Sequence, residues 1–187
     1  MTEKEKMIAG EWFIPTDPEL TRDRDQARRL SHRLNVELCD QDQTYRATLQ
    51  ELCPGLDGAF IRAPFQCDYG YNLYAGKGTF INFGCVCLDL APIRIGCRTL
   101  IGPNVQLLTA VHPMDAEERA TGIERGAEIG IGDDCWLGGG VIVCPGVRIG
   151  NRCIIGAGSV VTRNIPDDSI AVGNPARVIR TTSKLAK

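Results

Sequence analysis

Aliphatic residues recur every six positions through the C-terminal part of the chain. Glycine follows the aliphatic residue in four of six successive hexapeptides, and the fifth position is always small or aliphatic. A period of six is typical of parallel β-helices, in which short strands alternate with turns and stack coil upon coil. We therefore predict a mainly β solenoid with roughly 18 residues, or three hexapeptides, in each coil. The first residues, which we expect to point inward, are Ile131, Leu137, Val143, Ile149, Ile155 and Val161.

The same frame extends toward the N-terminus with two interruptions. Ile95, Ile101 and Leu107 begin three further hexapeptides. Weaker members precede them, and two slips of two residues, near Leu73 and near Pro92, change their phase. We therefore assign residues 56–187 to the solenoid, including a C-terminal tail.

Residues 1–55 lack the repeat and have helical character. Asp17 followed by Pro18 is typical of a helix N-cap with proline at the first helical position. Thr44 is the expected cap of a second, short helix. We therefore predict an N-terminal helical segment that precedes the solenoid.

The longest break in the repeat follows His112. Residues 113–128 are polar and fit no hexapeptide, so they must leave the solenoid as a loop before Ile131 resumes it. Departures from a regular fold are where function is expected. Histidine is the side chain whose usual pKa best suits a general base near neutral pH. His112 is therefore the candidate base, the alternative being a histidine that caps the loop. His32, in the helical segment, is expected to be a surface or packing residue.

Composition and charge narrow the function classes. The chain has 187 residues, which suits one domain, and a formal net charge of −2 without a dense basic block, which disfavours nucleic-acid binding. It has a polar start and no apolar run long enough to span a bilayer, so we expect a soluble cytoplasmic protein that does not bind membranes.

Nine cysteines raise the question of a metal site. Their number is odd, and no pair has the Cys-x2-Cys spacing. Cys85, Cys87, Cys135 and Cys153 occupy repeat positions that favour small apolar residues, a role that free cysteine fills well. We therefore predict buried thiols rather than ligands, and no metal.

Several motifs resemble those of the maltose and galactoside O-acetyltransferases, in order and over nearly the whole chain. The residues at 5–10 are similar to the N-terminus of the maltose enzymes. This resemblance implies a left-handed β-helix, a homotrimer with sites shared between subunits, acetyl-CoA as donor, and a hydroxylated acceptor such as maltose or glucose. The motifs are Asn82-Phe83 and the segments 92–96, 110–113, 134–138, 145–150, 156–162 and 172–176.

The resemblance also implies roles for individual residues on the acceptor side. His112 corresponds to the catalytic base, so no cysteine need act as nucleophile. Asn82 matches an acceptor-contacting asparagine, although a turn asparagine is the alternative. Glu124, in the loop, would orient His112 or bind the acceptor, unless it is one more solvated charge. Tyr71, where the galactoside enzymes have serine, and Asp89 are the remaining acceptor candidates.

The resemblance also implies residues that bind the donor, acetyl-CoA, which is an extended thioester with phosphates. Trp136 is a large aromatic outside the interior frame and resembles the family's tryptophan beside the donor pocket. Gly139 is our candidate for a backbone N–H donor to the thioester oxygen, and a corner glycine is the compatible alternative. Arginine suits phosphate because its donors form a fixed fork. The further donor candidates are Ala157, Thr162, Arg163, Arg177 and Arg180.

Two rival classes remain to be weighed. The γ-class carbonic anhydrases share the solenoid but bind zinc with three histidines, and this chain has two. A non-catalytic structural solenoid would have no reason to combine His112, Trp136 and the loop. Within the acetyltransferases, an enzyme acting on a non-sugar hydroxyl, such as that of an antibiotic, is the alternative to a sugar enzyme.

Overall fold

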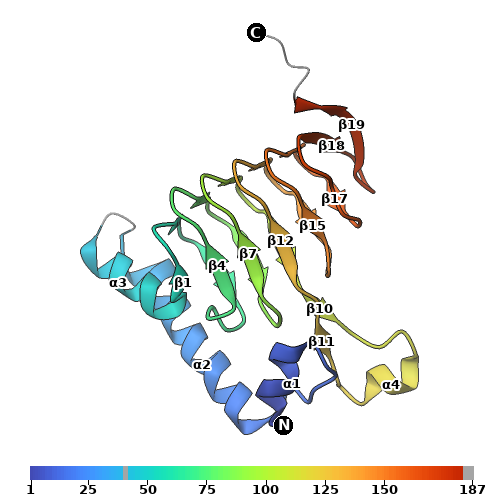
Figure 1. The fold of residues 1–187 in the computed structure, drawn as a ribbon. Coiled ribbons are helices and arrows are strands. Elements are labelled where there is room, and N and C mark those ends of the chain that lie inside the picture. Colours follow the sequence, from blue (N-terminus) through green and yellow to red (C-terminus); the bar gives the residue numbers. More distant parts are fainter. Residues whose placement is uncertain (40–41, 183–187) are drawn as a thin grey trace.

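A computed structural model describes residues 1–39 and 42–182, and it shows a parallel β-helix with an N-terminal helical segment, as predicted (Figure 1). Three sheets form the sides of the solenoid, and each coil contributes one strand to each sheet in turn. The first sheet contains β1 (Gly55–Leu56), β4 (Leu73–Ala75), β7 (Ile93–Ile95), β12 (Ile129–Ile131) and β15 (Arg148–Ile149). The second contains β2 (Phe60–Ile61), β5 (Phe80–Ile81), β8 (Leu100–Ile101), β13 (Trp136–Leu137), β16 (Ile154–Ile155), β18 (Ser169–Val172) and β19 (Arg177–Thr181). The third contains β3 (Phe65–Cys67), β6 (Cys85–Leu88), β9 (Gln106–Leu108), β14 (Ile142–Val143) and β17 (Val160–Val161).

The strand register confirms the predicted coil length. Ile131 pairs with Ile149 and Leu137 with Ile155, so residues 18 positions apart are neighbours in adjacent coils. In the earlier coils the offset is 20, as between Ile61 and Ile81. The two-residue slips in the sequence therefore correspond to longer coils, and the stacking of the strands continues through them.

The interior of the solenoid is filled by the repeat positions. All six predicted inward residues from Ile131 to Val161 are at most 4% exposed. The fifth positions are buried as well, and these include Cys135 and Cys153. Cys85 and Cys87 are also buried free thiols, as predicted. Burial of this apolar stack is what holds short strands of two to four residues together.

The helices precede the first coil. They are α1 (Glu3–Ala9), α2 (Pro18–His32), the π-helical η1 (Arg33–Glu37) and α3 (Gln43–Leu52). The Asp17 side chain accepts hydrogen bonds from the N–H groups of Glu19 and Leu20, which confirms the predicted N-cap. The prediction for Thr44 is wrong, because α3 begins at Gln43 and its N-cap is Asp42. Among residues 1–39 and 42–182, no helix combines the length and the apolar character that a bilayer span requires.

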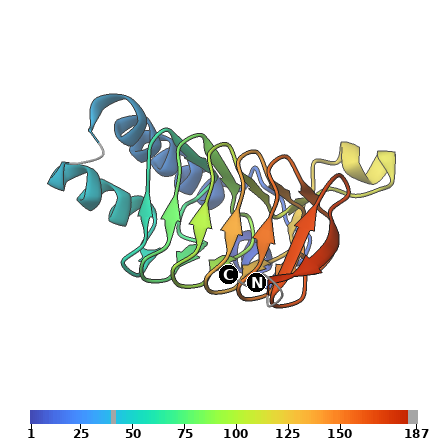
Figure 2. The same cartoon turned by 90° about the horizontal axis from the view of Figure 1, so that it is seen from above.

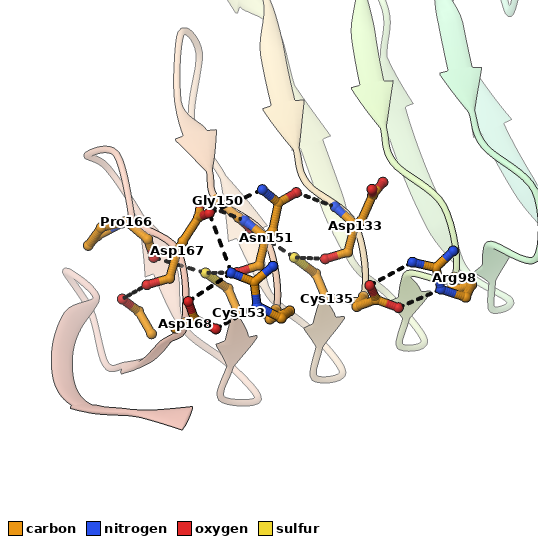
Figure 3. Close-up of polar contacts among 12 residues, drawn as sticks. Arg98, Asp133, Cys135, Gly150, Asn151, Cys153, Pro166, Asp167 and Asp168 are labelled. Atoms are coloured by element: carbon orange, nitrogen blue, oxygen red, sulfur yellow. Dashed lines mark hydrogen bonds and ion pairs between the residues drawn. The ribbon is translucent and has the colours of Figure 1, made fainter. Parts of the chain in front are cut away.

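The edge between the first and second sheets is held by polar side chains that stack along the solenoid (Figure 3). Asp133, Asn151 and Asp167 occupy equivalent places in successive coils, and each side chain accepts a hydrogen bond of 2.7–2.9 Å from a backbone N–H of the preceding coil. Two forked arginine–aspartate ion pairs lie beside this ladder, Arg98–Asp134 and Arg152–Asp168. The polar groups named here are satisfied within the chain, which gives this edge a structural role.

The loop after His112 leaves the stack, as predicted. β10 (Ala110–Val111) and β11 (Arg125–Gly126) pair in antiparallel fashion at its root, and α4 (Ala116–Ala120) lies at its far end, well away from the coils (Figures 1 and 2). Across the loop the pairing of Ile95 with Ile131 has an offset of 36 residues, twice the usual 18. The excursion therefore takes up the length of one extra coil, and the strands after it pair in the same register as those before it.

Two neighbouring glycines have different reasons to be glycine, and this makes a testable pair. A Cβ on Gly132 would lie 2.7 Å from the backbone nitrogen of Asn151, whereas a Cβ on Gly130 would meet only Arg148 Cγ, at 3.6 Å. We expect Gly132→Ala to lower the free energy of unfolding by about 1–3 kcal/mol, the usual cost of overpacking. Gly130→Ala should leave it unchanged or raise it by about 0.5–1 kcal/mol. Urea unfolding of both variants checks this, and equal effects would contradict the packing argument.

Candidate active site

Four of the predicted residues lie together along the edge between the second and third sheets. Asn82 follows β5, Gly139 follows β13, Ala157 follows β16, and Trp136 stands on β13 itself. Because the strands are stacked in register, these residues line one groove of about 470 Å³. The structure therefore brings together one acceptor candidate and three donor candidates.

One wall of this groove is apolar and uncovered. Phe80, Leu100, Trp136 and Ile154 are paired across four successive strands of the second sheet, so their side chains form a row on its outer face. Leu100 is 51% exposed and Trp136 is 55% exposed. A row of exposed apolar side chains on a protein surface indicates a place that a ligand or another chain covers.

Gly139 leaves its backbone N–H available. Its carbonyl accepts a hydrogen bond of 2.9 Å from Gly158 N–H, but its own N–H donates none to any residue of the described ranges. A Cβ on Gly139 would lie 3.4 Å from Pro103, whereas a Cβ on Gly138 would lie 2.6 Å from the backbone nitrogen of Ala157. Stacking therefore requires glycine at 138 and not at 139.

The arginines of the tail lie on β19, at the C-terminal end of the second sheet. Arg177 and Arg180 are exposed, and they pair with Val172 and Ile170 of β18. Val172 lies against Gly156, one residue before Ala157. Both arginines therefore stand in the last strand beyond the groove, in the same sheet as Trp136.

His112 lies on a different edge, between the third and first sheets. It follows β10, which comes directly after β9 of the third sheet. Its side chain is 56% exposed, so a small molecule can reach the imidazole. Thr162 and Arg163 follow β17 of the same sheet, and they are also exposed. The structure therefore groups His112 with Thr162 and Arg163 at one edge.

The two groups lie at opposite edges of the third sheet. Asn82 and Gly139 come immediately before strands of this sheet, whereas His112 and Thr162 follow its strands. A strand of two to four residues separates them in each coil, and the filled interior lies beneath. Within one chain, the candidate base and the groove therefore do not form a single site.

Glu124 is the residue that the structure places beside His112. Ala110 pairs with Gly126 and Val111 with Arg125, so the next position of this antiparallel register sets His112 opposite Glu124. Nε2 of His112 lies 3.9 Å from Oε2 of Glu124, which is an ion-pair contact rather than a hydrogen bond. Burial raises the pKa of Glu124, and a positive His112 opposes that rise. The carboxylate of Glu124 thus faces the imidazole from the neighbouring strand.

Asp89 is turned to the interior. It is fully buried and accepts hydrogen bonds of 2.9–3.2 Å from the N–H groups of Asp68, Tyr69 and Asn72. Burial raises the pKa of this carboxyl to about 6, and the backbone hydrogen bonds from Tyr69 and Asn72 act against the rise. The carboxylate thus closes the turn that carries Tyr71. The predicted contact of Asp89 with an acceptor has not been tested, and the buried position of its side chain does not support it.

Tyr71 makes its contacts with the N-terminal helices. Its hydroxyl donates a hydrogen bond of 3.0 Å to Asp23, and Nζ of Lys4 lies 4.8 Å from the ring centroid. Burial, followed by the charge of Asp23, raises the pKa of the Tyr71 hydroxyl. Tyr71 therefore packs between the turn and α2, and its contact with an acceptor stays a prediction.

Sequence patterns did not reveal the residues that surround Glu124. Arg24 donates a hydrogen bond of 2.7 Å to the hydroxyl of Tyr69, and both Arg24 and Asp68 are close enough to influence the pKa of Glu124. These residues come from a charged helix and from a turn, where such side chains are usually solvated. The short apolar stretch Trp12-Phe13-Ile14, between polar residues of the N-terminal segment, is the one signal that could have led to this cluster.

No group of three or more potential metal ligands occurs in the part of the chain that the structure describes. The thiols of Cys135 and Cys153 donate instead to backbone carbonyls of Gly150 and Pro166, at 3.0 and 3.1 Å (Figure 3). Burial raises the pKa of Cys85 to about 11, which keeps that sulfur protonated at neutral pH.

Comparisons with known proteins agree with this fold. A family model described as the maltose acetyltransferase hexapeptide capping motif matches residues 6–53, and one for bacterial transferase hexapeptides (six repeats) matches residues 128–163. Nodulation protein L of Rhizobium meliloti is 46% identical over 181 residues, which cover 95% of this chain and 97% of that protein.

Solved structures are similar over the same length. A maltose O-acetyltransferase from Clostridium difficile 630 is 43% identical, with a TM-score of 0.93 over 97% of each chain. A hexapeptide-repeat acetyltransferase from Vibrio cholerae, solved in complex with acetyl coenzyme A, is 39% identical, with a TM-score of 0.89 over 97% of this chain and 98% of that one. The chain is thus an acetyltransferase of the hexapeptide-repeat class and belongs to the maltose and galactoside O-acetyltransferase family.

Proposed function

We propose that this enzyme transfers the acetyl group of acetyl-CoA to a hydroxyl of a small sugar of the maltose or glucose kind, with His112 as general base. The observation that carries the proposal is the exposed His112 at the loop root, set opposite the half-buried Glu124. The relatives support the donor and the acceptor class, because one is named a maltose O-acetyltransferase and another was solved with acetyl coenzyme A.

The residues divide the reaction between them. The acceptor oxygen attacks the thioester carbonyl carbon, and His112 takes the hydroxyl proton as the new C–O bond forms. Glu124 stabilises the resulting imidazolium. The N–H of Gly139 donates to the carbonyl oxygen as negative charge develops there. The C–S bond then breaks, and the proton passes from His112 to the CoA sulfur.

Binding of the two substrates uses the remaining candidates. Trp136 and its apolar neighbours offer a wall for the pantetheine chain, along which Ala157 would also lie. Thr162 stands at the His112 edge and would reach the donor from a neighbouring chain. The guanidinium groups of Arg163, Arg177 and Arg180 suit the phosphates of CoA. Asn82 can both donate to and accept from sugar hydroxyls, and we assign Tyr71 and Glu124 to the acceptor side with it. Asp89 is left out of this assignment, because its carboxylate is buried and binds backbone N–H groups.

A shared site in a homotrimer would resolve the separation of the two groups. One chain holds the groove and His112 at opposite edges of its third sheet, so a neighbour turned about a threefold axis can present its His112 edge to the groove. The exposed row with Leu100 and Trp136 is then covered by the neighbour and by the donor.

An acceptor screen tests the proposed function. With acetyl-CoA as donor and free thiol release as readout, we expect turnover with maltose or glucose to exceed that with a galactoside and with a chloramphenicol-type alcohol. Preference for the alcohol would contradict the sugar assignment and support an antibiotic-modifying enzyme. Thiol release with none of the four acceptors would count against a small hydroxylated acceptor.

A further inference from the structure

The N-terminal segment forms a third strand beside the loop root. Phe13 and Glu124 exchange two backbone hydrogen bonds, of 2.9 and 3.2 Å, in an antiparallel bridge. On its other side, Glu124 stands opposite His112 through the β10–β11 register. Phe13, Glu124 and His112 thus lie side by side in three adjacent stretches of chain. Figure 1 shows α1 next to β10 and β11, at the root of the loop.

Phe13 is firmly anchored. Its side chain is 1% exposed and packs in a separate apolar cluster with Met7, Leu20, Tyr69 and Leu90. This cluster joins α1, α2 and the turn that Asp89 closes. The backbone of Phe13 is therefore fixed by side chains that belong to the body of the protein and not to the loop.

Contacts on both sides of Phe13 continue the attachment. Trp12 lies under the guanidinium of Arg125, with 5.1 Å from Cζ to the ring centroid. The carbonyl of Pro15 accepts a hydrogen bond of 2.6 Å from Arg24, the residue that also holds Tyr69. The segment is thus bound to the loop at positions 124 and 125 and to α2 behind it.

The loop has little regular structure of its own. β10 and β11 contribute two residues each, and all five residues of α4 are exposed. An isolated two-stranded ribbon of this length is marginal in water, so its order depends on what packs against it. The N-terminal segment supplies that packing at the position of Glu124.

We propose that Phe13 is a positioning residue for acetyl transfer, which acts by holding Glu124 in place opposite His112. The proposal rests on the role of His112 in the proposed function. It gives the N-terminal segment a task in the reaction besides that of covering the solenoid. Direct contact of Phe13 with either substrate is not part of it.

Kinetics of Phe13→Ala test the proposal. We expect kcat to fall by about 10–100-fold, the scale on which misplacement of a group outside the chemistry reduces turnover, with KM for acetyl-CoA unchanged. Ile14→Ala is the matched control, because Ile14 is the next residue and its side chain is 52% exposed. If Phe13→Ala changed only the KM for acetyl-CoA, or if Ile14→Ala lost as much kcat as Phe13→Ala, the proposal would be overturned.

A double-mutant cycle separates positioning from general damage. If Phe13 acts through Glu124, the double variant Phe13→Ala, Glu124→Gln should be no slower than Glu124→Gln alone, whereas independent effects would multiply. Multiplying effects overturn the inference. Should Phe13→Ala fail to fold, Trp12→Ala takes its place in the same cycle, because Trp12 is partly exposed and touches the loop through Arg125.

The outcome is distinguishable from failure of the proposed function. Near-normal turnover of His112→Ala would remove the proposed base and with it the reason for positioning Glu124. Loss of turnover in His112→Ala together with multiplying effects in the cycle would leave the base in place and overturn only the role of Phe13.

Discussion

His112→Ala should reduce acetyl transfer by about 10²–10⁴-fold, the usual contribution of a general base. The imidazole is 56% exposed, so its loss removes little packing and the fold should be retained. Steady-state thiol release from acetyl-CoA, measured with an acceptor that the wild-type enzyme uses, gives the comparison. Thermal unfolding of the same preparation verifies that the variant is folded.

The chain contains one other histidine, which provides a matched control. The His32 side chain is 66% exposed at the end of α2 and lies 3.8 Å from Glu37. His32→Ala should therefore turn over like the wild-type enzyme. Near wild-type activity in His112→Ala would remove this mechanism, whatever the acceptor.

Mixing two inactive variants should restore activity, because the two parts of the proposed site lie at opposite edges of the third sheet. His112→Ala keeps an intact groove, and Asn82→Ala keeps an intact base. In mixed trimers formed by unfolding and refolding the two chains together, about a quarter of the sites would combine an intact groove with a neighbour's intact His112. Activity should then rise from that of the separate variants to roughly that fraction of wild-type.

The control mixture pairs two changes on the same edge. His112 and Glu124 belong to one loop of one chain, so refolding His112→Ala with Glu124→Gln should give only the average of the two separate activities. Light scattering establishes whether the refolded protein is a trimer. Absence of recovery in the first mixture, with trimers present, would contradict a site shared between subunits.

The repeat predicted the solenoid well because each of its positions makes the same contact in every coil. An aliphatic residue such as Ile149 is buried for the same reason as Ile131 and Ile155, so one rule covers most of the chain. The groove followed partly from the same rule. Trp136 lies outside the interior frame of the repeat, and its exposure is what the pattern led us to expect.

Predictions that depended on single positions were less secure. Asp89 was selected as an acceptor ligand from its place in a motif, yet it is buried and binds three backbone N–H groups. Thr44 was selected as a cap from its residue type, although Asp42 occupies that place. Several polar residues in a short stretch offer the same local chemistry, and only their surroundings decide which one is used.

The sequence by itself determined the coil length, the interior residues, and the place at which the chain leaves the stack, because these depend on a period that local sequence carries. The tertiary structure decided at which edge of the solenoid, between which two sheets, each candidate residue lies. His112 and Trp136 both lie outside the interior frame of the repeat, and the period alone does not show that a sheet separates them. It also decided the partner of Glu124, since the bridge from Phe13 joins segments more than a hundred residues apart through backbone hydrogen bonds, which any side chains permit.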